Sequence, residues 1–271
     1  MSDLPQIPEL KLERKKSAML ATFNRPAERN ALNGAMIDGL FSLCGRLKSD
    51  DDVRALVLRG AGGTFCAGGD VKDFGRQLMT PDAGPNTTDP LIAVNRRFGD
   101  LLLALDALPQ VVVSIVEGAA FAGGLGFVAV SDVAIAASDA KFSLSEVTLG
   151  LVPAQIAPFL VRKIGSFAVR RLALTGLRFD AQAAKEQGLV NETVEPGAID
   201  AALLKTLNEI GRCEPEAVAA TKHLLRRAAP IDEALLDAAA AEFARCLRGA
   251  GRKGAAAFAA RTATPWLETF E

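Results

Sequence analysis

The sequence contains no tyrosine and only one histidine, His223, among its 271 residues. Without phenol groups, tyrosine acid–base chemistry is excluded, and a Ser-His-Asp or Cys-His triad could form only around His223. This histidine lies in a charged, helix-favouring stretch, 219–224, where a surface or interface position is more common than a catalytic one. The sequence therefore argues against triad-type nucleophilic catalysis.

Cysteine is also scarce, and the four that occur are Cys44, Cys66, Cys213 and Cys246. They form no C-x-x-C pair, which argues against a metal site or a disulfide framework and predicts reduced thiols. Segment 1–16 is polar with two prolines, and the longest apolar run, 111–116, is far too short to span a bilayer. These features predict a cytoplasmic protein with no membrane partner.

Neither sign of charge dominates, because 31 Lys and Arg residues stand against 32 Asp and Glu residues, for a formal net charge of −1. This balance provides no general attraction to nucleic acid or anionic lipid, so nucleic acid is not an expected partner. Hydrophobic residues make up 49% and charged residues 23% of the chain, which is typical of a globular protein. Any anionic ligand must therefore be bound by a local group of residues.

The first two thirds of the chain alternate between strand and helix patterns. Apolar runs predict strands at 10–12, 18–23, 53–59, 111–116 and 133–137. Helices are predicted at 34–48, where Asn33 can act as the N-cap, and at 91–108. A charged turn is expected at 13–17 and a loop rich in Pro, Gly, Asn and Thr at 75–90. This alternation is typical of an α/β fold.

From residue 154 onward the pattern is mainly helical, with one short strand predicted at 190–195. Segment 231–247 has the spacing of an amphipathic helix, and the glycines of 249–254 are expected to break it before a last turn at 255–261. We therefore expect an α/β core over 1–195 and a helical region over 196–271. Because an alanine-rich helical tail usually needs a surface to pack on, a neighbouring subunit is an attractive partner for it.

Two glycine clusters each follow a predicted buried strand, AGGD at 67–70 and AGGLG at 122–126. Glycine lets the backbone approach a ligand closely, and a helix that begins at the second cluster would point unpaired N–H groups at that ligand. Two converging N–H donors form an oxyanion hole. The alternative is that both clusters are only tight strand-to-helix turns. Neither cluster matches the P-loop or the dinucleotide-binding pattern.

Two carboxylates lie near these clusters in the sequence. Glu146 follows a Ser-Leu-Ser stretch, so by itself it could be either a helix-capping side chain or a proton-transfer group. Glu117 ends the predicted strand before the second cluster, and we expect it to pair with a neighbouring donor in a structural role.

The segments that carry a resemblance are, in chain order, NRP at 24–26, NALN at 30–33, FCAGGD at 65–70, EGAA at 117–120 and on to 126, SD at 131–132, Phe142, SE at 145–146, and LGLVP at 149–153. Taken together, these motifs resemble the enoyl-CoA hydratase/isomerase (crotonase) family over nearly the whole chain. The resemblance implies the crotonase (ClpP-like) fold, an α/β spiral core of repeated ββα turns with a C-terminal helical trimerisation region. A homotrimer or a dimer of trimers is the implied assembly.

The resemblance also implies a mechanism, in which the thioester oxygen of an acyl-CoA is bound by the N–H groups of Ala67 and Gly123. Glu146 corresponds to one of the two glutamates that handle water in the hydratases, and Gly126 stands at the position of the other. The implied activity is addition of water across the C2=C3 double bond of a 2-enoyl-CoA, with Glu146 moving the protons. Coenzyme A enters as part of the substrate, so no separate cofactor is expected.

Substrate contacts are implied by the same resemblance. Segment 153–159 is similar to the branch that acts on 3-methylglutaconyl-type and isohexenylglutaconyl-type esters, in which Gln155 could hydrogen-bond a second carboxylate or the water. A branched or glutaconyl-type acyl group would fit this branch. The residues expected to line the acyl pocket or to bind CoA are Arg29, Ala31, Gly68, Gly69, Asp70, Val71, Phe74, Phe121, Gly124, Gly126, Leu151, Gln155, Phe258 and Arg261.

Two other functions are compatible with these residues. Double-bond isomerisation, decarboxylation and thioester hydrolysis all use the same oxyanion hole, because a fold and a hole do not fix the reaction. A non-catalytic acyl-CoA-binding protein is the second alternative.

Overall fold

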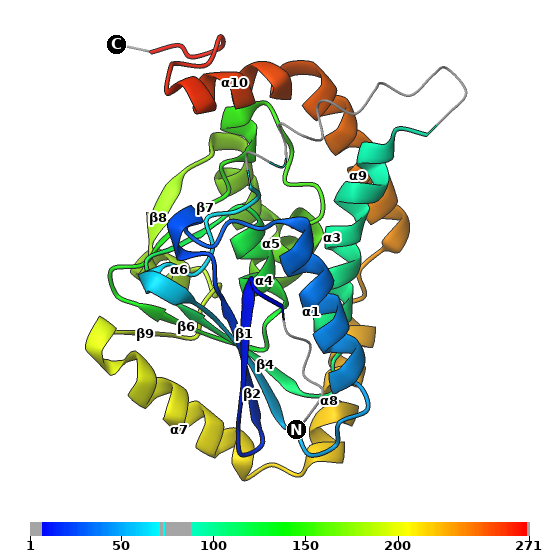
Figure 1. Ribbon diagram of the computed structural model, residues 1–271, viewed down its shortest axis with the longest axis vertical. Coiled ribbons are helices and arrows are strands. Elements are labelled where there is room, and N and C mark those ends of the chain that lie inside the picture. Colours follow the sequence, from blue (N-terminus) through cyan, green and yellow to red (C-terminus); the bar gives the residue numbers. More distant parts are fainter. Residues whose placement is uncertain (1–6, 71–72, 74–87, 270–271) are drawn as a thin grey trace.

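The computed structural model describes residues 7–70, 73 and 88–269. A six-stranded sheet with the strand order β1-β2-β3-β4-β6-β9 crosses the middle of the molecule (Figure 1). Its strands are β1 Leu10–Lys15, β2 Ala18–Phe23, β3 Ala55–Gly60, β4 Val111–Val116, β6 Val133–Ala137 and β9 Glu192–Val194. Strands β1 and β2 are antiparallel, and every other neighbouring pair in this sheet is parallel.

Strand β1 is longer than predicted. Its pairing with β2 continues to Lys15, through part of the segment that was expected to be a charged turn. The charges are accommodated because β1 is an edge strand whose alternate residues, among them Glu13, remain accessible to solvent. The turn itself occupies only Lys16 and Ser17, with Lys16 at a positive φ of 54°.

A second, three-stranded sheet was not predicted from the sequence. It consists of β5 Ala119–Phe121, β7 Lys141–Ser143 and β8 Arg178–Asp180, with β7 in the middle. Each strand has three residues, which is too short for an alternating pattern to stand out. This small sheet matters for the site because β5 leads directly into the second glycine cluster.

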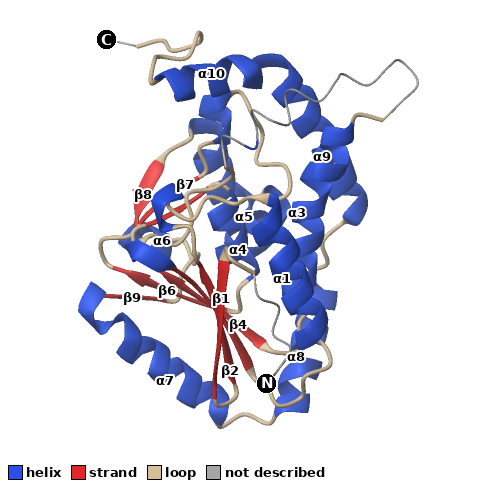
Figure 2. Ribbon diagram, in the orientation of Figure 1, coloured by secondary structure: helices blue, strands red, loops and turns tan. Residues whose placement is uncertain are grey.

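Helices lie on both sides of the large sheet (Figure 2). The α-helices are α1 Gly34–Leu47, α3 Pro90–Asp106, α4 Gly123–Val130, α5 Ala157–Thr175, α6 Ala181–Glu186, α7 Ile199–Gly211, α8 Pro215–Ala228, α9 Glu233–Cys246 and α10 Arg252–Ala260. Of these, α7 lies on one side of the large sheet and α1 and α3 lie on the other. Short 3-10 helices occur at η1 Pro26–Glu28, η2 Ala61–Gly63, η3 Glu146–Leu149 and η4 Pro196–Ala198, and a π-helical turn at η5 Leu247–Gly251. The predicted Asn33 cap is confirmed, because its side chain accepts the N–H of Met36 at 2.9 Å.

The core lies on both faces of the large sheet. Leu56 and Leu58 of β3 pack in the larger cluster with α1, α3, α4 and α5. Val57, between them, points to the opposite face and packs with Ile199 and Leu203 of α7. This alternation is the two-residue repeat of a strand buried on both sides, as expected for parallel strands.

The C-terminal helices fold back onto the α/β part. Helix α9 runs alongside α3, and α10 packs against η3 (Figure 1). The predicted break at 249–254 is confirmed in part, because the helix is kinked at Gly249, whose backbone angles of φ −89° and ψ −113° are not helical, while α10 already begins at Arg252. Helix α8 has no buried residue. Over the described ranges no helix has the length and apolarity needed to cross a membrane.

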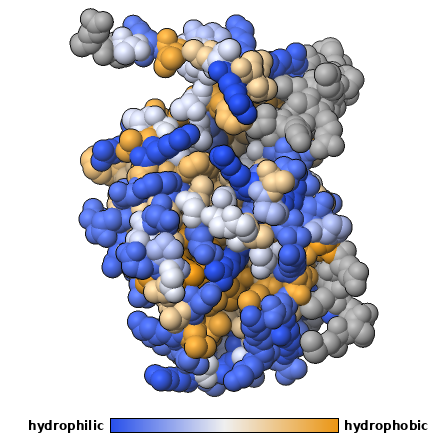
Figure 3. Space-filling view, turned by 60° about the vertical axis from the view of Figure 1, so that its left-hand side comes forward, coloured by the Kyte–Doolittle hydropathy of each residue, from blue (hydrophilic) through white to orange (hydrophobic). Residues whose placement is uncertain are grey.

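The surface mixes polar side chains with apolar patches, as Figure 3 shows for one face. Large apolar side chains are exposed on two helices in particular. Phe167 and Leu174 of α5 are 92% and 66% exposed, and Leu224 and Leu225 of α8 are both 65% exposed. Exposed apolar side chains of this size are typical of surfaces that contact another protein.

Candidate active site

The structure brings the two glycine clusters side by side. The Cys66 N–H donates to the Ala119 carbonyl at 2.9 Å, and the Phe121 N–H donates to the Cys66 carbonyl at 2.9 Å. A Cβ on Gly68 would lie 2.9 Å from the Cβ of Ala122, and φ at Gly68 is +95°. Glycine is therefore required here both for space and for backbone conformation.

The second cluster starts with a strained residue. Ala122 has φ 46° and ψ −117°, a conformation that side-chain-bearing residues rarely adopt. Its sharp turn makes Gly123 the first residue of α4, so the Gly123 N–H has no acceptor within the helix. All eight residues of α4 are buried, and the positive end of the helix dipole coincides with this N–H. The backbone at Gly123 is thus suited to bind a developing negative charge.

The predicted role of Ala67 is not compatible with its hydrogen bonding. The Ala67 N–H donates to the Arg29 carbonyl at 3.1 Å, so it is already used inside the protein. Two residues later, a bridge to Leu32 is formed by the Gly68 carbonyl and the Asp70 N–H, at 2.7 and 2.9 Å. The intervening Gly69 N–H points away from this bridge and meets no acceptor within the described part of the chain.

Leu32 connects Gly69 with Gly123. Its backbone forms the bridge around Gly69, and its Cδ1 atom lies 2.6 Å from where a Cβ on Gly123 would be. The two N–H groups that lack acceptors therefore flank the same residue. The hydrogen bonds of segment 67–70 show that Gly69, and not Ala67, has the N–H without an acceptor, and the sequence motif alone did not reveal this.

Glu146 is the second element of the site. It begins η3 and is only 8% exposed, and neither carboxylate oxygen has a hydrogen-bond partner among the described residues. Burial raises its pKa from 4.5 to about 7. A buried, unpaired acceptor is costly, by about 1–3 kcal/mol, and such groups concentrate at functional sites. At neutral pH this carboxyl group can both accept and release a proton.

The pairing of β5 with β7 places the segment that contains Glu146 beside the second glycine cluster. Phe121 of β5 is in register with Ser143 of β7, and the Ser143 carbonyl accepts the Ala122 N–H at 2.9 Å. Glu146 follows Ser143 by three residues and Gly123 follows Ala122 directly. The two segments therefore leave the small sheet at the same end.

The position of Gly126 is closed by apolar side chains. A Cβ on Gly126 would lie 3.2 Å from Leu102 Cδ1 and 3.3 Å from Phe98 Cζ, both on α3. The Phe98 ring also packs edge-on against Phe127, with ring centroids 5.7 Å apart. The side of the site where a second glutamate would be expected is thus an apolar wall.

Asp70, the last residue of the first cluster, is held in place by an ion pair. Its carboxylate pairs with Arg25 at 2.7 Å, and the Arg25 guanidinium also donates to the Ala31 carbonyl. The fully buried Asn30 accepts the Arg25 N–H at 2.9 Å and donates to the Ala61 carbonyl at 2.9 Å. Arg25 and Asn30 were part of the motif but were not assigned a role from sequence, and they hold the loop that carries Gly69.

Gln155 does not have the position that was predicted for it. It is 1% exposed, and its amide nitrogen donates to Asn95 Oδ1 at 2.9 Å and to the Leu236 carbonyl at 3.0 Å. The side chain therefore joins α3 to α9, and its amide N–H groups are not free to bind a substrate carboxylate. The predicted bond from Gln155 to a substrate carboxylate is therefore wrong, whereas its buried Oε1 atom, which could accept a bond from water, has no partner among the described residues.

The other predicted contact residues are scattered around the loops. Leu151 packs in a cluster with Leu91 and Phe243, and the Phe121 ring lies under the Arg178 guanidinium at 5.4 Å. Of the remaining described positions, Arg29, Phe258 and Arg261 are exposed, Ala31 is partly buried, and Gly124 is buried in α4. Val71 and Phe74 lie outside the described residues.

Gly124 also explains the close packing of the two loops. A Cβ there would lie 2.7 Å from the Cys66 carbonyl oxygen. Burial raises the pKa of the neighbouring Cys66 thiol to about 12, so this cysteine is no nucleophile at neutral pH. Glu117 pairs with Arg59 at 2.7 Å, which confirms its structural role, and His223 is exposed on α8, which confirms its surface position.

Comparison with known proteins supports one family. The chain matches the model of the Enoyl-CoA hydratase/isomerase family over residues 13–269. An enoyl-CoA hydratase of Mycobacterium tuberculosis, EchA19, is 33% identical over 232 residues, which cover 83% of each chain. The 2,3-dehydroadipyl-CoA hydratase of Escherichia coli is 30% identical over 220 residues, covering 81% of this chain and 82% of the relative. The crystal structure of an enoyl-CoA hydratase/isomerase from Marinobacter aquaeolei, 42% identical, superposes with a TM-score of 0.78 and covers 96% of this chain and 99% of its own.

Proposed function

The chain belongs to the enoyl-CoA hydratase/isomerase family and is an enzyme of the hydro-lyase type, and we propose that it adds water across the C2=C3 double bond of a 2-enoyl-CoA thioester. The observation that carries this proposal is a buried, unpaired Glu146 on a segment that leaves the small sheet at the same end as Gly123, whose N–H, like that of Gly69, has no acceptor in the described chain. These are the proton carrier and the charge-stabilising donors that hydration requires.

The oxyanion hole is formed by Gly69 and Gly123 in this proposal. The thioester oxygen would accept both N–H groups, and negative charge that moves onto it as the enolate forms would meet the positive end of α4. Removing one such donor typically costs about 3–4 kcal/mol of barrier. Gly69 replaces Ala67 in this role because the Ala67 N–H is bonded to Arg29.

Glu146 moves the protons. In its ionised form it takes one proton from water while the water oxygen bonds to C3, and the pair of electrons of the double bond passes to the thioester as an enolate. The protonated Glu146 then returns a proton to C2, which regenerates the carboxylate and leaves the 3-hydroxyacyl-CoA product. A pKa of about 7 makes both transfers accessible near neutral pH.

A single carboxylate serves this chemistry, because Phe98 and Leu102 occupy the side where a second one would be expected. The same feature supports a second candidate function, double-bond isomerisation, in which Glu146 would carry a proton between C2 and C4 without adding water. Both reactions place negative charge on the thioester oxygen, as a 3-hydroxy enolate in hydration and as a dienolate in isomerisation, so both can use the same oxyanion hole.

For the acyl group we retain the proposal of a branched or carboxylated chain of the glutaconyl type. Its support is the resemblance of segment 153–159 to that branch, together with a relative at 30% identity whose name specifies 2,3-dehydroadipyl-CoA, a carboxylated enoyl thioester. Gln155 no longer contributes to this proposal, because its amide binds Asn95 and Leu236.

The assembly and the CoA contacts are also proposals. The exposed apolar side chains of α5 and α8 support a homotrimer or a dimer of trimers, and the division into a 1–195 core and a 196–271 oligomerisation region goes with it. Arg29, Phe258 and Arg261 are exposed and accessible to a CoA group, which enters as part of the substrate. The cytoplasmic location belongs to the same set of proposals.

A substrate panel tests the function. The purified protein is incubated with straight-chain, branched and carboxylated 2-enoyl-CoAs, and the enoyl thioester absorbance is followed together with free thiol and CO₂. Loss of absorbance without thiol or CO₂ release supports hydration when the product is a 3-hydroxyacyl-CoA, whereas a 3-enoyl-CoA product would identify isomerisation. Release of thiol or CO₂ would identify hydrolysis or decarboxylation, and tight binding without turnover would identify a non-catalytic acyl-CoA-binding protein.

A further inference from the structure

Helix α4 must be held in place by its surroundings. It carries the proposed donor Gly123 at its first residue, but its sequence, GGLGFVAV, contains three glycines in eight positions. Glycine is among the least favourable residues for a helix, and a helix this short is not stable alone. The position of the Gly123 N–H therefore depends on contacts made elsewhere along α4.

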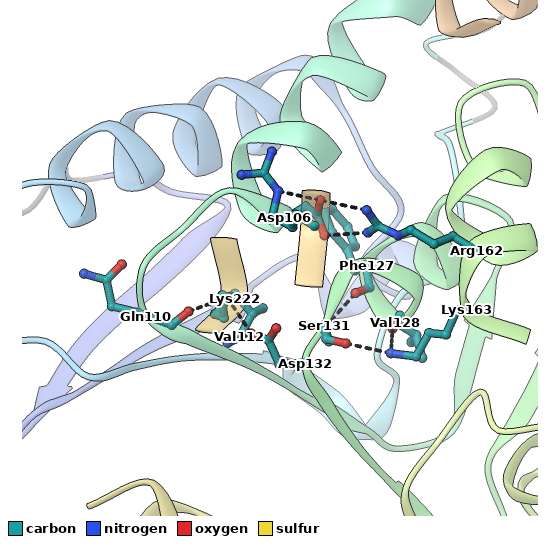
Figure 4. A network of polar contacts seen from close by, with 11 residues as sticks. Asp106, Gln110, Val112, Phe127, Val128, Ser131, Asp132, Arg162, Lys163 and Lys222 are labelled. Atoms are coloured by element: carbon teal, nitrogen blue, oxygen red, sulfur yellow. Dashed lines mark hydrogen bonds and ion pairs between the residues drawn. The ribbon is translucent and has the colours of Figure 1, made fainter. Parts of the chain in front are cut away.

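A charged contact is made at the opposite end of the helix. The ammonium group of Lys163, which comes from α5, donates to the Val128 carbonyl at 3.0 Å and to the Ser131 carbonyl at 2.6 Å (Figure 4). These carbonyls belong to the last turn of α4 and its C-cap, where no intrahelical donor is available. Lys163 thus places a positive charge directly on the negative end of α4.

Other polar contacts fix the same end to β4 and, through Asp132, to α8. The Ser131 hydroxyl donates to the Phe127 carbonyl at 2.8 Å and lies 2.7 Å from the Ser114 hydroxyl of β4. Asp132 accepts the Val112 N–H at 2.7 Å and the Lys222 ammonium at 2.6 Å (Figure 4). Over the described ranges, Lys163 is the cation whose ammonium binds the carbonyls of this helix end directly.

A positive charge at the C-terminus of α4 changes the electrostatic potential at the Gly123 N–H because α4 is short. Eight residues at 1.5 Å each span about 12 Å, and the path between the ends runs through buried residues that salt does not screen. A cation at the C-terminus of a helix opposes the negative end of the dipole. With its negative end offset, α4 attracts an anion at Gly123 more strongly.

We propose that Lys163 is a positioning residue for the oxyanion hole: by binding the C-terminal carbonyls of α4 it fixes the Gly123 N–H and strengthens its attraction for the enolate oxygen. This inference rests on the proposed function. Lys163 differs from Gly69, Gly123 and Glu146 in that it lies at the far end of α4 and is given no contact with the substrate or the attacking water.

The charged groups around Lys163 are few. Helix α4 contributes none, the turn after it contributes Asp132, α3 contributes Asp106, and α5 contributes Arg162. From α8, Lys222 binds Asp132 and Arg226 binds Asp106. Burial lowers the pKa of Lys163 to about 8, so the ammonium predominates at neutral pH and is lost above pH 8.

The neighbouring Arg162 provides a matched control. Its guanidinium donates to Asp106 at 3.0 Å and, within the described part of the chain, forms no hydrogen bond or ion pair with α4 (Figure 4). The variants are Lys163→Met, Lys163→Gln and Arg162→Met. Each is assayed for kcat on the enoyl-CoA turned over by the unmodified enzyme and for binding of a para-amino-cinnamoyl-CoA, whose absorption moves to longer wavelength when its carbonyl is polarised.

We expect Lys163→Met to lower kcat by roughly tenfold, the effect of one charge at this distance in a protein interior, and to reduce the red shift of the bound probe. Lys163→Gln should do the same, and Arg162→Met should lower the thermal stability while leaving kcat and the red shift unchanged. Unchanged kcat and red shift in a folded Lys163 variant overturn the inference, as do equal losses in Arg162→Met.

A measurement on the intact lysine covers the case in which both Lys163 variants fail to fold. In the Glu146→Gln background, the red shift of the bound probe is followed from pH 7 to pH 9.5, and it should decrease as Lys163 deprotonates. A constant red shift overturns the inference. If the unmodified enzyme does not polarise the probe, the proposed oxyanion hole is wrong. Failure of the proposed function is thereby distinguished from failure of the role of Lys163.

Discussion

The Ala122 N–H donates to the Ser143 carbonyl at 2.9 Å, and this bond joins the second glycine cluster to the strand that leads to Glu146. Two segments that are about twenty residues apart in the sequence are thereby placed together, one with an acceptor-free N–H and the other with a buried carboxyl group. The site is therefore a product of the small second sheet, and its chemistry follows from what the backbone leaves unpaired.

Replacing Glu146 with glutamine should abolish most of the activity. General acid–base catalysis is worth about 10²–10⁴-fold, so kcat on the best enoyl-CoA should fall by that factor while KM changes little. Steady-state kinetics on the purified variant provide the measurement. Glu117→Gln is the control, because Glu117 binds Arg59 and should be dispensable for turnover. An unchanged kcat in Glu146→Gln would remove this carboxylate from the mechanism.

The same substitution should change how stability depends on pH. The pKa of Glu146 is raised in the folded state to about 7 from 4.5, so the folded protein loses stability from this group as pH rises between these values. Glu146→Gln should therefore be more stable than the unmodified protein at pH 8, by up to about 3 kcal/mol, and similar to it at pH 4. Urea unfolding at the two pH values measures the difference. A stability difference that does not depend on pH would contradict the raised pKa.

Gly123→Ala should disturb the oxyanion hole by steric contact. The new Cβ would meet Leu32 Cδ1 at 2.6 Å, so the first turn of α4 must shift or the leucine must move. We expect kcat to fall by up to about 10²-fold, as when one oxyanion donor is misplaced. Adding Leu32→Ala makes room for the Cβ, and part of the activity should return in the double variant. Equal activity in the single and double variants would show that this contact is not the cause.

Gly126→Glu should not create a two-glutamate hydratase. The side chain would run into Phe98 and Leu102, whose atoms would lie 3.2–3.3 Å from the new Cβ. Overpacking of a core position typically costs about 1–3 kcal/mol, so the variant should be less stable and no more active. Phe98→Ala in the same chain should relieve the crowding. Higher hydratase activity in the single variant would mean that the apolar wall is not rigid.

Much of the large sheet could be predicted from the sequence. The strands at 18–23, 111–116 and 133–137 were predicted with the bounds they have, because each is a compact apolar run between turn residues. The cap at Asn33 followed from local chemistry as well. The crotonase family and its fold are confirmed by the comparisons and by the helical C-terminal region.

The parts that were missed depend on tertiary pairing. The strands of the small sheet are too short to be recognised. Only the bonds of segment 67–70 with Arg29 and Leu32 reveal that the Ala67 N–H is occupied and the Gly69 N–H is not. Gln155 was expected to face the substrate, but helix packing turns its amide toward Asn95 instead. The hydrogen bond from Arg25 to Asp70 joins residues that are 45 positions apart, and local sequence patterns do not indicate such a contact.

The central claim, that Glu146 and the two glycine loops add water to an enoyl thioester, is tested most directly by identifying the product. The unmodified enzyme is supplied with its best 2-enoyl-CoA in D₂O, and the acyl group is analysed by NMR. The account predicts a hydroxyl group on C3 and one deuterium on C2, with neither formed by Glu146→Gln. A shifted double bond, free coenzyme A or released CO₂ as the main product would contradict it.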